Sequence, residues 1–131
     1  MTVDANGEEG RTSGTAAASA TQMPVDLGHL RRFTLGDRRL EIEILGLFIE
    51  QMPITLSALR DAESDRDWVN AAHTLKGSSR AVGAWRLAKL AERAERLGGT
   101  SDRAACERAL DHLEEAAGEA RAHIEALSSD D

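Results

Sequence analysis

Residues 65–84 carry the sequence DRDWVNAAHTLKGSSRAVGA, in which apolar or small side chains recur at three- and four-residue steps. At about 100° per residue, one side of a helix gathers six of them. These are Trp68, Ala71, Ala72, Leu75, Ser79 and Val82. Ser64 or Asp65 can cap the start of the helix, and Gly83 is a suitable stop. The stretch therefore predicts a helix to about Val82 with a single buried face.

Helical periodicity continues on both sides of this stretch. It predicts a short helix over residues 26–33, capped by Asp26, and a longer one that starts at Thr34 or Asp37 and reaches about residue 62. Pro53 should kink or break that longer helix. A fourth helix is expected over residues 84–97, and a last one follows Ser101 or Asp102. We expect Leu27, Leu30, Phe33, Leu90 and Leu97 among the inward side chains.

These helices define the expected architecture. Aromatic residues make up only 3% of the chain and β-branched residues are sparse, which argues against a sandwich or barrel. Short connections between long amphipathic helices favour antiparallel neighbours. We therefore expect an all-α, up-and-down four-helix bundle over residues 26–131, with the short N-terminal helix packed across one end. Residues 1–25 are rich in Gly, Ser, Thr and Ala, so we expect them to be a disordered tail.

Composition narrows the function classes. The 131-residue chain has 16 basic and 23 acidic side chains and a formal net charge of −7, which makes it a poor partner for nucleic acid. A single cysteine, Cys106, excludes an internal disulfide framework, and it lies in the apolar register of the last helix. No histidine pair has the i, i+4 spacing of a helical zinc motif, so we expect no metal or cofactor site. With no long apolar run or secretory signal apparent, we expect a cytoplasmic protein without a membrane segment.

A second apolar stripe lies on the expected helix over residues 37–62. It consists of Leu40, Ile44 and Leu47, away from the main stripe that includes Leu45 and Phe48. Either the short N-terminal helix covers it, or it is left exposed for a partner. That partner is a second protein or a second copy of this chain. We expect a monomer, and a dimer formed through this stripe stays open.

The polar side of the helix over residues 65–82 carries candidate chemistry. With His73 set at zero, Lys76, Gly77 and Arg80 project on the same side of the helix. A histidine that carries a phosphoryl group needs an exposed ring nitrogen and nearby positive charge. Gly77 costs the helix about 1 kcal/mol relative to alanine, and it leaves room for another active site to approach. The alternative is an ordinary surface histidine among surface cations.

The run His73-Thr-Leu-Lys-Gly-Ser-Ser79, followed by Val82-Gly83-Ala84, resembles the histidine-containing phosphotransfer (HPt) domains of two-component phosphorelays. The resemblance extends over about residues 27–127. It implies that His73 is the phosphoacceptor through Nε2, that Lys76 is the phosphate-side cation and that Gly77 is the close-approach position. Arg80 is a further candidate from its charge and its place on the same helix side. It also implies receiver domains of response regulators or a hybrid sensor histidine kinase as partners, with magnesium held by the receiver.

One position departs from that family pattern. Some members place a glutamine on the following helix, where it can bond the active imidazole or the phosphate, whereas the matching residue here is Glu95. A carboxylate repels phosphate, so we expect Glu95 either to turn away toward Arg66 or another cation, or to make no such contact. The chain has no G-x-x-x-x-G-K-[ST] loop, so we expect a carrier without ATP-dependent kinase activity. The alternative function is a helical adaptor that binds receiver or kinase domains without transferring phosphate.

Overall fold

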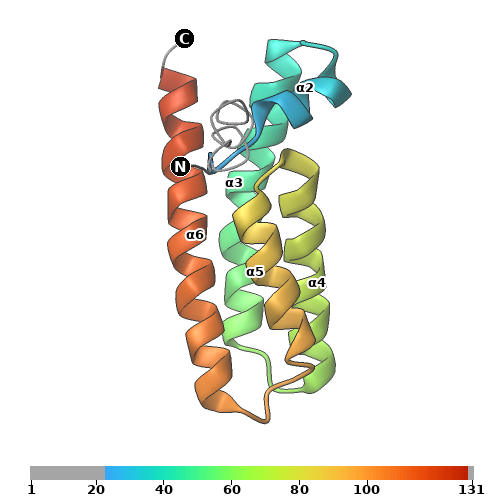
Figure 1. Cartoon of the computed structure of the whole chain (residues 1–131), viewed down its shortest axis with the longest axis vertical. Coiled ribbons are helices and arrows are strands. Elements are labelled where there is room, and N and C mark those ends of the chain that lie inside the picture. The colour runs from blue at the N-terminus through green and yellow to red at the C-terminus, as the bar shows by residue number, and fades with distance from the viewer. Residues whose placement is uncertain (1–22, 130–131) are drawn as a thin grey trace, which may run out of the picture.

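The computed structural model describes residues 23–129, and most of the predicted tail (residues 1–22) lies outside them. Five helices make up this part of the chain: Leu27–Thr34 (α2), Arg38–Arg60 (α3), Asp65–Val82 (α4), Trp85–Arg96 (α5) and Arg103–Ser129 (α6). The four long helices run alternately up and down, and α2 lies across one end (Figure 1). Helix α4 packs against α3 and α5, and α6 packs against the other sides of the same two helices. The predicted all-α bundle is confirmed.

Three helix starts follow the predicted capping chemistry. The side chains of Asp26, Asp37 and Ser64 each accept a hydrogen bond from the backbone N–H three residues later. Such bonds satisfy amides that have no partner inside the helix. Asp37, and not Thr34, starts α3. The capping residue of each of these helices is thus among the candidates that the sequence offered.

The α4–α5 turn is also the anchor for α2. Gly83 ends α4 with φ +81°, and its carbonyl accepts a hydrogen bond from the Asp26 backbone N–H (2.9 Å). A Cβ at Gly83 would lie 2.8 Å from the Asp26 carbonyl oxygen, so glycine is required by both conformation and space. Trp85 Nε1 donates to Asp26 Oδ2 (2.9 Å). These contacts hold the short helix against the end of the bundle.

The buried face predicted for α4 is confirmed at all six positions: Trp68, Ala71, Ala72, Leu75, Ser79 and Val82 are buried. The largest of them, Trp68, is 1% exposed and donates a hydrogen bond from Nε1 to the Ala94 carbonyl of α5 (2.7 Å). A buried indole N–H needs such a partner to avoid a desolvation penalty. Trp68 thus joins α4 to α5 by packing and by a directional bond.

Several sequence predictions differ from the structure. Phe33 is 68% exposed because α2 buries Leu30 and Thr34 instead, and its ring makes a T-shaped contact with the ring of His29. Leu97 is 42% exposed because α5 ends at Arg96 and the chain turns toward α6. Pro53 does not break α3; it lies on the exposed side, while Met52 is buried in the core. Packing of a long apolar face outweighs the local cost of proline. Val25, assigned to the tail, is buried.

The second apolar stripe of α3 is only partly covered. Leu40 and Leu47 are 40% and 59% exposed, and Ile44 is half-buried. Helix α2 instead meets α3 at a buried polar contact, in which Thr34 Oγ1 donates to Glu41 Oε2 (2.8 Å). By length and composition α3 is apolar enough to cross a membrane, a test that core helices of bundles also pass. The absence of a membrane segment therefore stays a prediction.

Candidate functional site

His73 lies in the middle of α4, on the side opposite the buried face. Its side chain is 67% exposed, in contrast to Ala72 and Leu75, which are completely buried. A regular helix holds the backbone at this position in a fixed orientation, because α4 is capped at Ser64 and stopped at Gly83. The imidazole is thus presented to solvent from a rigid support.

Glu95 on α5 reaches across to this imidazole. Its Oε2 lies 3.0 Å from His73 Nδ1, and its Oε1 lies 2.7 Å from Lys76 Nζ. Glu95 pairs with a cation as expected, with Lys76 in place of Arg66, but it does not turn away from the imidazole. The expectation that it makes no contact with the imidazole is wrong. Glu95 is therefore the residue of this site that sequence reasoning left out.

The carboxylate is held in its ionised form. The pKa of Glu95 lies below its ordinary value, in the first place because Lys76 donates a hydrogen bond to it. Partial burial acts in the opposite direction, and the hydrogen bond with His73 lowers the pKa further. At neutral pH Glu95 is thus a charged acceptor between two nitrogen groups.

This contact determines which ring nitrogen of His73 is available. Because an ionised carboxylate can only accept, Nδ1 of His73 must carry the proton in the hydrogen bond with Glu95. The other nitrogen, Nε2, then holds the lone pair in the neutral ring. No hydrogen bond or ion pair joins Nε2 to any residue in the range 23–129. The arrangement presents an exposed nucleophilic nitrogen.

The other predicted site residues are arranged differently. A Cβ built at Gly77 would meet no atom within 4 Å, so the surface one turn after His73 is open. Lys76 is only 17% exposed, because its ammonium group lies against Glu95. Arg80 points toward Glu92, with Nη2 3.6 Å from Oε2. The structure therefore brings His73 and Lys76 together through one carboxylate, and it joins Arg80 to a different one.

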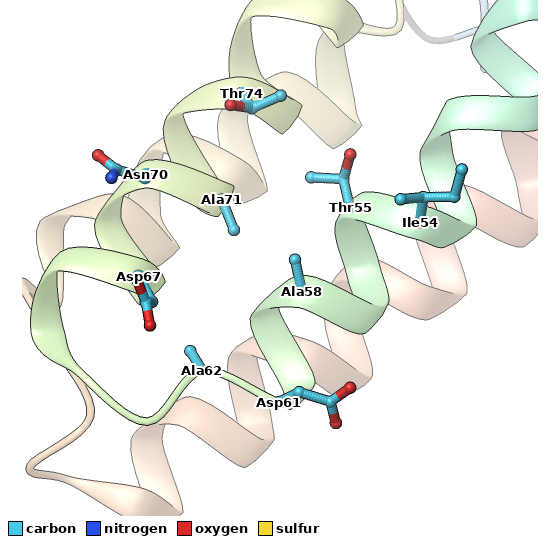
Figure 2. A pocket seen from close by; sticks show the side chains of 9 residues that line it. All are labelled: Ile54, Thr55, Ala58, Asp61, Ala62, Asp67, Asn70, Ala71 and Thr74. Carbon is cyan, nitrogen blue, oxygen red and sulfur yellow. The ribbon is translucent and has the colours of Figure 1, made fainter.

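A groove of about 390 Å³ lies between α3 and α4, and Thr74, the residue after His73 in the sequence, is part of its lining (Figure 2). Thr55 and Ala58 of α3 face Ala71 and Thr74 of α4 across it, and Ile54 stands at its rim, 61% exposed. The small side chains of Ala58 and Ala71 leave this space open, and Asp61 and Asn70 add polar groups to its lining.

Metal-binding residues do not gather at this site. Within the described residues there is no group of three or more His, Cys, Asp or Glu side chains that could hold a metal ion. Cys106 is buried in α6, as predicted, and its thiol contacts the Gly99 carbonyl. His29 contacts the rings of Phe33 and Trp85.

Residues 43–128 match the family model of the Hpt domain. Neither the curated proteins nor the solved structures contain a match to the chain. Because the match spans most of the sequence, the protein belongs to the Hpt domain family. Domains of this family act in histidine phosphotransfer in two-component systems, where they interact with receiver domains and kinases.

Proposed function

We propose that the protein is a phosphocarrier in which His73 accepts a phosphoryl group from a phosphorylated aspartate of one receiver domain, or from a sensor kinase, and passes it to an aspartate of another receiver. The observation that carries this proposal is the contact between Glu95 and Nδ1 of His73 (3.0 Å), with Nε2 exposed and unpaired among residues 23–129. In a phosphoacceptor histidine one ring nitrogen carries the proton and is hydrogen-bonded, while the other keeps its lone pair free to attack phosphorus.

The transfer step from an aspartyl phosphate balances without moving a proton. The lone pair of His73 Nε2 attacks phosphorus, the bond between phosphorus and the aspartyl oxygen breaks, and the electron pair leaves with the carboxylate of the donor. The ring becomes an imidazolium whose Nδ1–H points at Glu95. In the return step an acceptor aspartate attacks phosphorus, and the electron pair of the P–N bond goes back to Nε2.

Glu95 has a specific part in this scheme. Its carboxylate stabilises the positive charge that the ring acquires when Nε2 bonds to phosphorus, because it lies at the opposite nitrogen. Lys76 carries the opposite charge on the same patch and is placed to turn toward an incoming phosphate. Glu95 therefore orients the imidazole and need not touch the phosphoryl group.

The partner completes the site. His73 lies on a convex helix face, and Gly77 leaves the neighbouring surface open for a receiver active site. In this proposal the receiver supplies the aspartate and the magnesium ion that neutralises phosphate charge. The protein itself acts in the cytoplasm as a monomer and does not bind ATP.

Labelling by a phosphorylated receiver domain tests the proposal. The wild type should take up the labelled phosphoryl group, and the His73→Gln variant should not. His123→Gln is the matched control, since His123 lies on α6 and His73 on α4, and α4 is not among the helices that α6 packs against. An unlabelled wild type, or a His73→Gln variant labelled as fully as the wild type, would contradict the proposal.

The same two proteins, wild type and His73→Gln, distinguish phosphotransfer from the alternative adaptor function. An adaptor would bind the receiver domain with the same dissociation constant in the wild type and in His73→Gln, and neither would be labelled. Calorimetric titration of the receiver into both proteins measures that binding. Phosphotransfer predicts label in the wild type only.

A further inference from the structure

A second groove lies between α5 and α6. It has a volume of about 330 Å³ and is lined by Arg86, Lys89, Leu90 and Arg93 of α5 and by His112 of α6. At about 100° per residue, the α5 positions in this groove point away from Glu95, which lies nearly 180° from Arg86 around the helix. Helix α5 therefore separates this groove from His73.

The charged side chains on the two sides of α5 differ in whether they form ion pairs. On the side toward α4, Glu95 is paired with Lys76 and Glu92 is paired with Arg80. On the groove side, Lys89 and Arg93 form no ion pair with any residue that the structure describes. The α5 carboxylates are thus occupied, and two cations of the groove are not neutralised.

The groove is polarised along its length. At one end Arg86 pairs with Glu115 and Glu119 of α6, which cancels its charge. Toward the other end Lys89, Arg93 and His112 follow, with Leu90 half-buried beside them. A chain of net charge −7 therefore concentrates unpaired positive charge beside an apolar side chain.

Packing of the bundle does not require these cations. Leu87, Ala91 and Ala94 of α5 and Leu113 and Ala117 of α6 are buried in the core, whereas Lys89, Arg93 and His112 are exposed. Exposed charges without partners contribute little to stability. Their gathering in one groove is consistent with a binding role.

We propose that the α5–α6 groove binds an acidic segment of a partner protein, with Asp or Glu side chains on Lys89 and Arg93 and one apolar side chain on Leu90. Charge complementarity and the apolar contact point to this occupant. Nucleic acid is disfavoured, since the carboxylates of Glu115 and Glu119 at one end of the groove oppose a continuous phosphate backbone, whereas a short acidic segment needs only the other end. A segment bound here would leave His73 uncovered.

A labelled peptide provides the probe. A fluorescein-labelled ten-residue peptide, with glutamates and one central leucine, is titrated with the full-length protein at low salt and followed by fluorescence anisotropy. The wild type should bind the peptide, and 0.5 M NaCl should weaken binding, because screening acts on exposed charges. A lysine peptide of the same length should not bind. Absence of binding by the glutamate peptide would overturn the proposal.

Matched variants distinguish the groove from general charge. Lys89→Glu with Arg93→Glu should weaken binding by about tenfold or more, the size of two lost charge contacts. Arg39→Glu with Arg66→Glu changes the net charge equally at exposed positions on α3 and α4, and should change the dissociation constant far less. Equal losses in both double variants would overturn the proposal. So would tighter binding of a single-stranded oligothymidylate than of the glutamate peptide.

Two further measurements keep this inference separate from phosphotransfer. The His73→Gln variant should bind the peptide as the wild type does, whatever its labelling by a receiver. Amide shifts in an NMR titration should change along α5 and α6 around Lys89, Arg93 and His112, and not around His73. Shifts confined to the surroundings of His73 would contradict a separate groove. Circular dichroism of each variant checks that the bundle is retained.

Discussion

The carboxylate of Glu95 lies 3.0 Å from Nδ1 of His73, and the other ring nitrogen, Nε2, is the one that we propose reacts. The two residues come from different helices, so the contact depends on how α4 and α5 pack. The contact selects the tautomer of the neutral ring, and in the proposed phosphotransfer it would offset the positive charge of the phosphorylated ring. Glu95 is a positioning residue in this description.

Removal of the Glu95 carboxylate should slow phosphotransfer. Glu95→Ala should lower the rate of labelling of His73 by about tenfold or more, in line with other carboxylates that orient a functional histidine. Glu95→Gln should lose less, since its amide oxygen still accepts from Nδ1–H. Nitrogen NMR of the ring should show a larger share of the other tautomer in Glu95→Ala. An unchanged tautomer together with a slow rate would argue against positioning.

Lys76 should control the ionisation of Glu95. Because the Lys76 hydrogen bond is the largest cause of the lowered pKa, Lys76→Ala should raise the Glu95 pKa toward its ordinary value. Because the carboxyl pKa is lowered in the folded protein, the contact of Glu95 with Lys76 stabilises the folded state at neutral pH. This stabilisation is lost as the pH falls through the folded-state pKa of Glu95. Carbon NMR of the carboxyl group during an acid titration measures the shift. Lys89→Ala, on the other side of α5, should leave it unchanged.

Gly77 should show opposite effects on stability and on transfer. Gly77→Ala adds a Cβ that meets no atom within 4 Å, so the free energy of unfolding should rise by about 1 kcal/mol. Gly77→Leu should slow labelling by a phosphorylated receiver far more than labelling by phosphoramidate, a donor small enough to avoid the new side chain. Gly118→Ala, an open position on α6, should stabilise without slowing transfer. If Gly77→Leu slowed labelling by the receiver and by phosphoramidate equally, a close-approach role for Gly77 would be contradicted.

Asp26 should make the stability of the bundle sensitive to acid. Its pKa is lowered, chiefly by the hydrogen bond from Trp85 Nε1, with burial acting in the opposite direction. The stabilisation is present at neutral pH and is lost as pH falls below roughly 4. Asp26→Asn should reduce the free energy of unfolding by about 1–2 kcal/mol at pH 7. The difference from wild type should narrow near pH 3 in urea titrations, and the exposed Asp111→Asn should show no such trend.

The residues that sequence reasoning placed well are those whose position depends on their own helix. All six buried residues of α4 follow from periodicity, and the exposure of His73 follows from the same projection. Phe33 and Leu97 were misplaced because they lie at helix ends, where the turn and the neighbouring helix decide what is covered.

Glu95 was missed for a different reason. Repulsion between its carboxylate and a phosphate argued against a role at the site. In the structure the carboxylate instead contacts Nδ1 of His73 and the ammonium group of Lys76. A signal was present: Ala84 lies midway between His73 and Glu95 in the sequence, and residues equidistant from the turn of an antiparallel pair lie opposite each other. Which ring atom a side chain meets still depends on rotamers that a sequence pattern does not specify.

The buried indole of Trp68 has a consequence for the distant surface. Its N–H is bonded to the Ala94 carbonyl, the peptide oxygen directly before Glu95. This bond fixes the position of α5 along its axis relative to α4. If α5 shifted by one residue, Glu95 would move by about 1.5 Å along that axis. The distance between the Glu95 carboxylate and the His73 imidazole therefore depends on a buried tryptophan, which no partner protein can contact.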